Sequence, residues 1–366
     1  MAISNMMKAL NPEIKAHKKG SIDEFWFLLF NKLDYLCKLQ LIICPDSEFH
    51  KKESLLSPFY KSLKRIYQLL SHGVSFNNRE VIERYQIYQH ITNWLKGEHD
   101  KELELDINTI VRGNLNGWQD HLIISADMGF DEKLIDDFRK NRERLCSSLS
   151  EVFKRWQTET NRDFYDWFNE EVQSFGTVVL EAHLNYLKKI KRYQGILNEE
   201  SISAFINPPP ATILICMIHR ILKKNGINSS EIIEKTDQYL HSPYIKDIPI
   251  VKISAMMYAA IVRKAAAGQK KPPNQGMYND IFIISGLLPY CDAMFIDNTC
   301  YNHLSEHPLV DEIDYNTKLF SQNCKEEFLE YLDAIESDAS KSHIDKVYEV
   351  YGKEWARPFN EIFKHR

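Results

Sequence analysis

The stretch YNDIFIISGLLPYCDAMFIDN, residues 278–298, decides the fold that we predict for this chain. It places three carboxylates, Asp280, Asp292 and Asp297, among apolar neighbours. The letters DIFIISGLL predict a short helix that begins at Asp280 and is closed by Pro289. The letters AMFIDN then predict a strand with Asp297 at its C-terminal end.

Two further apolar stretches extend this pattern to both ends of the chain. LQLIICP, residues 39–45, is a short continuous apolar run that ends in proline, which is typical of a strand buried on both faces. DYNTKLFSQN, residues 314–323, predicts another short strand, and a helix comes after it. Short buried strands that alternate with helices favour a parallel α/β sheet, so we expect the sheet to be assembled from both ends of the chain.

The long region between the two ends has helical periodicity. Apolar residues recur at three- and four-residue spacing from about residue 58 to residue 240. We therefore predict an α/β fold that is helix-dominated overall and carries a large all-helical insertion or lobe. The predicted parts are residues 1–57 and 245–335 for the α/β domain, 58–244 for the helical lobe and 336–366 for a helical tail.

The composition fits a folded globule and excludes several classes of protein. The chain has 366 residues, 44% of them apolar, which is enough for one large domain or two ordinary ones. Its formal net charge of −5 argues against a generally basic nucleic-acid coat protein but is compatible with a local basic groove. The seven cysteines lack CxxC spacing, so neither a structural zinc site nor a disulfide framework is predicted. Without a signal-peptide pattern or an apolar run that spans a bilayer, we expect a cytoplasmic protein with no membrane association.

The carboxylates fall where ligands bind to an open parallel sheet. Such ligands bind beyond the C-terminal ends of the strands, where Asp297 closes AMFIDN and Glu53 comes after LQLIICP. Asp280 and Asp292 belong to the same segment as Asp297, and a cluster of this kind repels itself unless cations neutralise it. Mg²⁺ or Mn²⁺ suits several carboxylate oxygens plus water, and it can orient water for attack on a phosphodiester. The sequence therefore predicts a metal site at this edge of the sheet.

Each of these residues also has a plainer interpretation. Asp280 can be only a helix N-cap, Asp292 only a turn residue, and Glu53 only a solvated helix residue. His50 can simply pack or bond to the backbone. Asp297 is the hardest to explain in this way, because it comes directly after an apolar strand.

Three segments resemble parts of the PIN-domain family. LIICPDSEFHKKE resembles the family's strand-then-helix segment, which reads P-x-S-x-x-H-x-x-E. The matching residues are Pro45, Ser47, His50 and Glu53. Residues 278–298 resemble the later segment in which one Asp begins a helix and another ends the next strand, and DYNTKLFSQN resembles the last strand of the family.

The resemblance, which covers about residues 2–57 and 245–335, implies a metal-dependent nuclease. PIN domains are mostly ribonucleases, with a parallel sheet in a three-layer α/β/α sandwich. The family's pattern implies metal-binding roles for Glu53, Asp280 and Asp297, with Mg²⁺ or Mn²⁺ as the cofactor. Asp292 is then an added acidic member of the catalytic set.

The chain departs from the family's pattern at its start. The first strand of the family ends in an Asp, and the letters MAISNMMKAL resemble the segment that comes directly after that Asp in the family. The first strand and the first acidic ligand are therefore absent from this sequence, and we expect either that the true start lies upstream or that this version has lost a central strand. Loss of one of four acids weakens metal binding and transition-state stabilisation.

The candidate substrate contacts come from a basic stretch before the acidic segment and from the segment that matches the PIN pattern. RKAAAGQKKPP, residues 263–273, brings four cations together shortly before the acidic segment: Arg263, Lys264, Lys270 and Lys271. Such residues attract phosphates, and a solvated helix face is the alternative interpretation. Ser47 and His50, from the segment that matches the PIN pattern, complete the predicted substrate contacts.

Three functions stay open at this point. The first is a nuclease that hydrolyses phosphodiester bonds, with RNA favoured over DNA and with the helical lobe binding substrate or a protein partner. The second is a catalytically impaired PIN-like module that binds nucleic acid or protein without turnover. The third is a helical scaffold with a coincidental acidic cluster; a structure without a parallel sheet joining residues 39–45 to 293–297 would favour it and contradict both others. No glycine-rich phosphate loop, GxSxG or HExxH motif supports another chemistry.

Overall fold

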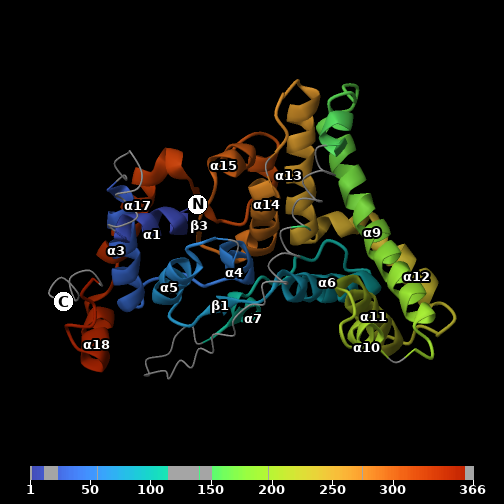
Figure 1. Ribbon diagram of the computed structural model, residues 1–366, viewed down its shortest axis with the longest axis horizontal. Helices are drawn as coiled ribbons and strands as arrows, with labels where there is room; N and C mark the ends of the chain where they lie inside the picture. Colours follow the sequence, from blue (N-terminus) through green and yellow to red (C-terminus); the bar gives the residue numbers. More distant parts are fainter. Residues whose placement is uncertain are drawn as a thin grey trace.

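The structure, a computed structural model, describes residues 2–11, 24–55, 57–113, 140, 151–196, 198–273 and 275–358; the side chains of Lys52, Glu53 and Gln275 lie outside this set. Within the described residues the chain is helix-dominated, as predicted, and carries two small two-stranded sheets. Figure 1 shows helices from both ends of the chain gathered on one side of the molecule and helices from its middle on the other.

The first group contains helices from the N- and C-terminal parts of the chain. They are α1 (Ala2–Leu10), α3 (Phe25–Lys38), α4 (Glu48–Leu55), α5 (Tyr60–Ser71), α17 (Lys325–Ser337) and α18 (Lys341–Tyr351). Apolar residues of α1, α3, α5 and α17 form one hydrophobic cluster, in which Leu29, Phe30 and Leu36 of α3 are fully buried. Phe328 of α17 packs into the same cluster, so the two ends of the chain share a core.

The second group contains helices from the middle of the chain. They are α6 (Arg79–Leu95), α7 (Ile107–Ile110), α9 (Phe164–Arg192), α10 (Glu199–Ile206), α11 (Pro210–Lys224), α12 (Ile232–Leu240), α13 (Pro249–Ala266), α14 (Gln275–Leu287), α15 (Asn298–Leu304) and α16 (Leu309–Glu312), together with the 3₁₀ turns η1 (Pro243–Asp247) and η2 (Leu288–Tyr290). A third 3₁₀ turn, η3 (Gln322–Cys324), directly precedes α17 and packs with the first group. A second hydrophobic cluster joins α13 to α6, α9, α11, α12, α14 and α15. In the part of the chain that the structure describes, no single helix has the length and apolar character to cross a membrane; the bent pair α10 and α11 passes that test together, by length and composition alone.

Both sheets are short. β1 (Ser75–Phe76) pairs antiparallel with β2 (Val111–Arg112). β3 (Ala293–Phe295) pairs in parallel with β4 (Lys318–Phe320). The strands predicted within residues 293–298 and 314–323 are therefore confirmed.

The strand predicted at residues 39–45 is not formed. The chain there belongs to no ladder. The next residue, Asp46, forms an isolated parallel bridge: its N–H donates to the Val74 carbonyl (3.0 Å), and its carbonyl accepts from the Phe76 N–H (2.8 Å). The predicted ladder between residues 39–45 and 293–297 is therefore wrong, because both segments line a cavity instead of pairing with each other.

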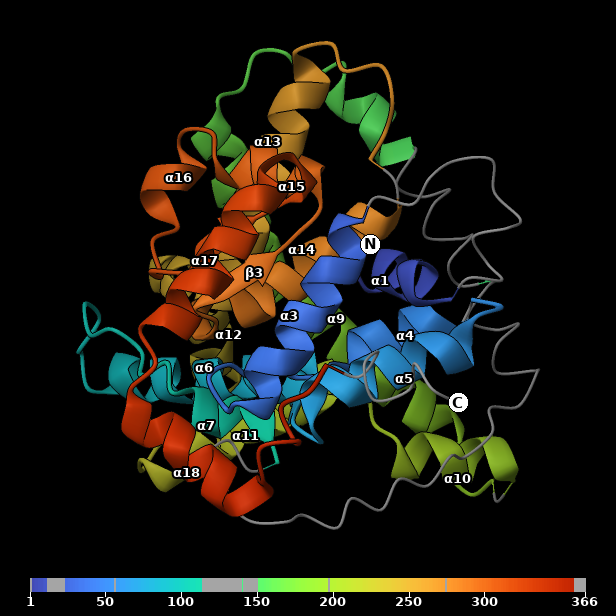
Figure 2. The ribbon, with the colours of Figure 1, turned by 90° about the vertical axis from the view of Figure 1, so that its left-hand side faces the viewer.

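β3 is covered on both faces. Ala293 and Phe295 pack against the cluster of the chain ends, and Met294 and Ile296 pack against the cluster around α13. This alternation is that of an extended strand, whose successive side chains point to opposite faces. Figure 2 shows the resulting layers, with α3 and α17 on the near side of β3 and α14 behind it. By the criterion given for the third hypothesis, the absence of a ladder between residues 39–45 and 293–297 in the described part of the chain favours a helical scaffold. The parallel strand β3, covered on both faces, is the feature that such a scaffold does not explain.

A buried amide joins the helical middle to the segment after residue 244. Gln86 of α6 is fully buried, and its Nε2 donates to the Tyr290 hydroxyl (3.1 Å). Its Oε1 accepts a hydrogen bond from the Ile250 N–H (2.9 Å). The cluster around α13 also spans this point of the chain. The predicted division at residue 244 passes through a shared core, and the four-part division of the chain stays a prediction.

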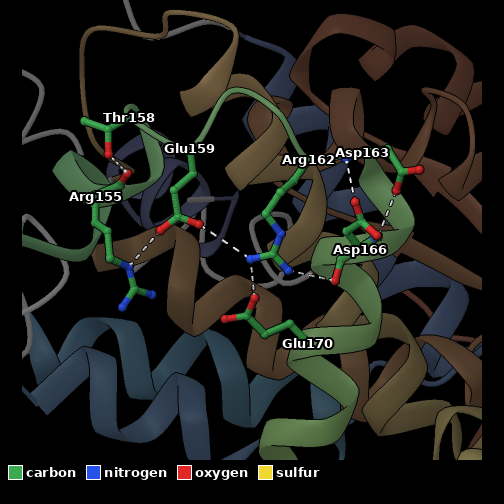
Figure 3. Close-up of polar contacts among 7 residues, drawn as sticks. All are labelled: Arg155, Thr158, Glu159, Arg162, Asp163, Asp166 and Glu170. Carbon is green, nitrogen blue, oxygen red and sulfur yellow. Dashed lines mark hydrogen bonds and ion pairs between the residues drawn. The ribbon is translucent and has the colours of Figure 1, made fainter.

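A polar network surrounds the start of α9 (Figure 3). Arg162 forms ion pairs with Glu159, before the helix, and with Glu170, within it. Asp163 caps the helix by accepting a hydrogen bond from the Asp166 N–H (2.8 Å), and the Asp166 carboxylate accepts one from the Asp163 N–H (3.1 Å). Because exposed ion pairs contribute little individually, we attribute the starting point of this 29-residue helix mainly to the capping box.

The close approach of α9 to α12 gives a test of the packing. A Cβ atom on Gly176 would lie 2.4 Å from the Leu240 carbonyl oxygen. Gly176→Ala should therefore lower the free energy of unfolding by about 1–3 kcal/mol, in spite of the higher helix propensity of alanine. Gly286 in α14 has nothing within 4 Å of the corresponding position, so Gly286→Ala should raise that free energy by up to about 1 kcal/mol. Urea denaturation measures both, and changes of the same sign would contradict the packing described.

Candidate functional site

The candidate site is a large cavity beside β3. Its volume is 1890 Å³, well above the upper end of ordinary ligand pockets, about 1000 Å³. Its walls come from α1, residues 40–45, α4, α13, α14, β3 and α15. It runs along β3 over its length and continues to Asp297, beyond the C-terminal end of the strand. This is the end at which ligands bind to parallel strands.

Asp297 lies where the sequence predicts it, just after β3, and it lines the cavity. It is also the N-cap of α15: its carboxylate accepts a hydrogen bond from the Thr299 N–H (2.8 Å). The side chain is half-buried. One carboxylate oxygen is thus engaged by the helix, and the residue still faces the cavity.

Asp280 also lines the cavity, but it does not begin the helix as predicted. α14 starts five residues earlier, at Gln275, so Asp280 lies in the second turn and the N-cap interpretation is wrong. Asp280 and Asp297 lie near the same buried thiol, Cys300. The pKa of Cys300 is raised above its usual range, first by burial and then by the negative charges of these two aspartates. The fold therefore places Asp280 and Asp297 in the same cavity and near the same thiol.

Asp292 lies at the opposite end of β3 from Asp297. Five residues of extended chain separate their Cα atoms by roughly 16 Å. Asp292 is exposed, and its carbonyl accepts the Lys318 N–H (2.9 Å) at the start of the β3–β4 ladder. Two carboxylates this far apart cannot share one ion, so we leave Asp292 out of the proposed site.

Glu53 lies on α4, but its side chain is outside the described residues. Two neighbours on the same helix, His50 and Ser54, line the cavity. Within the described part of the chain, no group of three or more His, Cys, Asp or Glu side chains is arranged to hold a metal ion. A metal site on the described residues therefore rests on two carboxylates.

Ser47 and His50 are occupied by local structure. Ser47 is 1% exposed, and its hydroxyl accepts the His50 N–H (3.2 Å) and bonds to His50 Nδ1 (2.9 Å). The His50 ring stacks on Tyr67, with centroids 5.3 Å apart. Ser47 is thus shielded from a substrate, whereas His50 reaches the cavity wall.

The predicted cations divide into two pairs. Lys264 and Lys271 line the cavity, and the other two, Arg263 and Lys270, are not among its described lining residues. Lys264 Nζ lies 2.9 Å from a Glu306 carboxylate oxygen, and Arg263 lies 3.6 Å from the other one. Only Lys264 and Lys271 are therefore placed to meet a phosphate in the cavity.

The sequence interpretation overlooked α15. Asn298, Asn302 and His303 of this helix all line the cavity. Asn298 and Asn302 are one helical turn apart, a spacing that was available as a signal. His303 is 3% exposed, and its Nδ1 has no hydrogen-bond partner in the described part of the chain. Burial, together with the smaller effect of the Lys264 charge, lowers the pKa of His303 to about 4, so the ring is neutral at pH 7.

The lowered pKa of His303 predicts a loss of stability in mild acid. In the unfolded chain this histidine has its usual pKa of about 6.5 and binds a proton first as the pH falls. Its contribution to stability is complete above about pH 6.5 and is lost between there and pH 4; at pH 5 the loss amounts to about 2 kcal/mol. We expect His303→Gln to lose less stability than the parent between pH 7 and pH 5 in urea titrations. Equal losses in both proteins would contradict the neutral buried ring.

Comparison with known proteins identifies no relative. No family model, no curated protein and no solved structure matches this chain.

Proposed function

We propose that this chain is a divalent-metal-dependent nuclease that cleaves RNA, with Asp280 and Asp297 as its metal-binding residues. The observation that supports the proposal is the convergence of these two carboxylates on one cavity, beside the same thiol, at the C-terminal end of a parallel strand. The resemblance of the surrounding segments to PIN domains favours RNA as the substrate.

The two carboxylates fit a small divalent cation. Mg²⁺ prefers oxygen ligands and is commonly held by one or two carboxylates, with water and substrate phosphates completing its shell. Asp280 and Asp297 would hold Mg²⁺ or Mn²⁺, and Glu53 on α4 is the predicted third ligand. Such an ion, if bound, would supply Lewis-acid chemistry to a phosphodiester held in the cavity.

Other residues of the cavity favour a phosphate-bearing ligand. Lys264 and Lys271 bring positive charge to the walls that the aspartates also line. Glu306 holds the Lys264 ammonium in place at 2.9 Å, which fixes the position of the charge. Asn302 on α15 offers amide groups for hydrogen bonds to sugar or base edges. Because the cavity is larger than one nucleotide requires, a short single-stranded segment fits the available space better than a free nucleotide.

A second function, nucleic-acid or protein binding without turnover, is favoured by a different observation. Asp106, Asp280, Asp292 and Asp297 line the cavity, but among the described residues no three acidic side chains lie close enough to hold one ion, whereas a complete acidic set has three or four. A site with two carboxylates binds metal less tightly, and cleavage then becomes slow relative to dissociation of the RNA.

Asp297→Asn separates the metal function from the structural one. Asparagine caps a helix as well as aspartate does, so α15 should keep its start and the thermal midpoint should change little. Removal of the charge should lower Mg²⁺- or Mn²⁺-dependent cleavage of a labelled RNA at least about 100-fold. Asp280→Asn should have a similar effect, and Asp292→Asn, at the far end of β3, serves as the matched control with about parental activity.

The same assay, repeated with a chelator and with DNA of the same sequence, distinguishes the two functions. The nuclease proposal fails if Asp297→Asn cleaves RNA as fast as the parent protein. RNA binding that a chelator leaves unchanged, with no cleavage by the parent, would establish the second function instead.

A further inference from the structure

Two cysteine thiols face each other near the end of α3. The Cys37 thiol donates a hydrogen bond to the Cys44 sulfur, and the two sulfur atoms lie 3.8 Å apart. Neither residue is in a disulfide. Among the described cysteines, no other two thiols are joined by a hydrogen bond, so this is the pair at which chemistry between two thiols can begin.

A reversal of the chain after α3 produces this contact. In a continuous helix, residues seven positions apart lie roughly 10 Å apart along the axis. Here the Gln40 N–H donates to the Cys37 carbonyl (3.0 Å). The Leu41 N–H donates to the Leu36 carbonyl (3.0 Å), and together these are the two bonds of a Schellman turn. Gln40 has the left-handed backbone that this turn requires, with a φ of 55°. The turn ends the helix and brings Cys44 back to Cys37.

The two thiols differ in their access to solvent. Cys37 is 6% exposed, and the pKa of its thiol is well above the usual range, first because of its hydrogen bond to Cys44 and then because of burial. Cys44 is half-buried and lines the cavity, as do its neighbours Ile43 and Pro45. A small reagent in the cavity therefore meets Cys44 first, while Cys37 keeps its proton.

The segment that carries Cys44 is free of the ladder bonds that would hold it in place. Residues 41–45 belong to no sheet, and residues 42–44 make no backbone–backbone hydrogen bond with the described part of the chain. A disulfide places its sulfur atoms about 2.0 Å apart, so the two thiols must approach each other by roughly 1.8 Å. Rotation of the Cys44 side chain and a small shift of this segment supply that movement.

We propose that Cys37 and Cys44 are a redox-reactive pair, which a hydroperoxide that enters the cavity converts into a disulfide and a thiol reductant restores. In the cytoplasm that the sequence predicts, a disulfide of this kind is transient and acts as a redox signal. The pair uses neither the metal-binding aspartates nor RNA, so it does not rest on the nuclease proposal.

The oxidation takes place in two balanced steps. The Cys44 sulfur attacks one oxygen of the hydroperoxide, the O–O bond breaks, and the other oxygen leaves as an alcohol or water with the proton of the Cys44 thiol. The Cys37 sulfur then attacks the sulfur of the resulting sulfenic acid, the S–O bond breaks, and water leaves with the Cys37 proton. The two thiols lose two electrons and two protons, and the hydroperoxide takes up both.

The disulfide would tie the cavity wall to the end of α3. It closes residues 37–44 into a ring, which restricts the opening of the segment between the two cysteines. We expect the Ile42 and Ile43 amides to exchange their hydrogens at least about threefold more slowly in the oxidised protein than in the reduced one.

Peptide mapping of the parent protein tests the pair directly. The reduced, folded chain is treated with hydrogen peroxide, its remaining thiols are blocked with N-ethylmaleimide, and it is then denatured and digested with trypsin without reduction. Trypsin cleaves after Lys38, so only a disulfide holds the peptides of Cys37 and Cys44 together. This linked pair should be the main disulfide product of the folded chain and should disappear with dithiothreitol. The same treatment in concentrated urea should give a mixture of pairings.

Three serine variants assign the roles within the pair. Cys44→Ser should give no linked pair and leave Cys37 reduced, because burial shields it. Cys37→Ser should accumulate a sulfenic acid on Cys44, which dimedone labels. Cys291→Ser is the matched control, because Cys291 also lines the cavity and burial raises the pKa of its thiol to about 12. Its loss should change the yield of the linked pair by no more than about twofold.

The outcomes separate the redox pair from the nuclease. A folded parent without the linked pair, pairing of Cys44 with Cys291 in place of Cys37, or the same mixture of pairings in folded and unfolded chains would overturn the redox pair. Metal-dependent RNA cleavage by a chain that forms no linked pair refutes the redox pair alone. A linked pair in a chain that cleaves no RNA supports the redox pair and refutes only the nuclease.

Discussion

The side chains of β3 pack alternately into two hydrophobic clusters, and the other parts of the molecule are arranged around this packing. One cluster is built from helices of both chain ends, and the other from the helices around α13. The strand has only three residues, Ala293–Phe295, so its own ladder contributes little. Burial of its two faces is what fixes its direction, and its direction in turn decides where Asp297 emerges.

The candidate site depends on a short continuous segment. Asp280 and Asp297 are joined by α14, η2 and β3, so their relative position is set within one supersecondary unit. Gln86 holds the turn of this unit through the Tyr290 hydroxyl. The cations have a different origin: Lys264 comes from α13, and Glu306 just after α15 fixes it. The acidic half of the site is therefore local, and the basic half depends on tertiary packing.

The amino-acid sequence was sufficient to predict the acidic half of the candidate site, which is local in the chain. A three-residue apolar run that ends at an Asp predicted β3 and the position of Asp297, because both depend on neighbouring residues. The start of α14 was missed because QKKPPNQG carries strong loop signals, yet burial of Met277 and Tyr278 extends the helix back to Gln275. Such tertiary effects override local propensity.

The strand predicted at residues 39–45 failed for another reason. Its apolar pattern resembles that of a buried strand, but a ladder also needs a partner at the right distance, and local pattern carries no information about that. His303 was overlooked in the same way, since its burial and its lowered pKa depend on the packing around it and on Lys264, which lies far away in the sequence. The features of the site that depend on residues distant in the chain could therefore not be predicted from the sequence alone.

The shared core of the chain ends has a kinetic consequence. Phe30 of α3 packs in one cluster with Phe328 of α17, which is made roughly 300 residues later. At about 5–20 residues per second, a ribosome needs on the order of 15 to 60 s to supply that partner. During this interval the apolar faces of α1, α3 and α5 lack the part of their cluster that α17 supplies. Part of the apolar surface of the first helices thus stays uncovered until the last helices are made, and long-range closure of this kind generally slows folding and favours aggregation of incomplete chains.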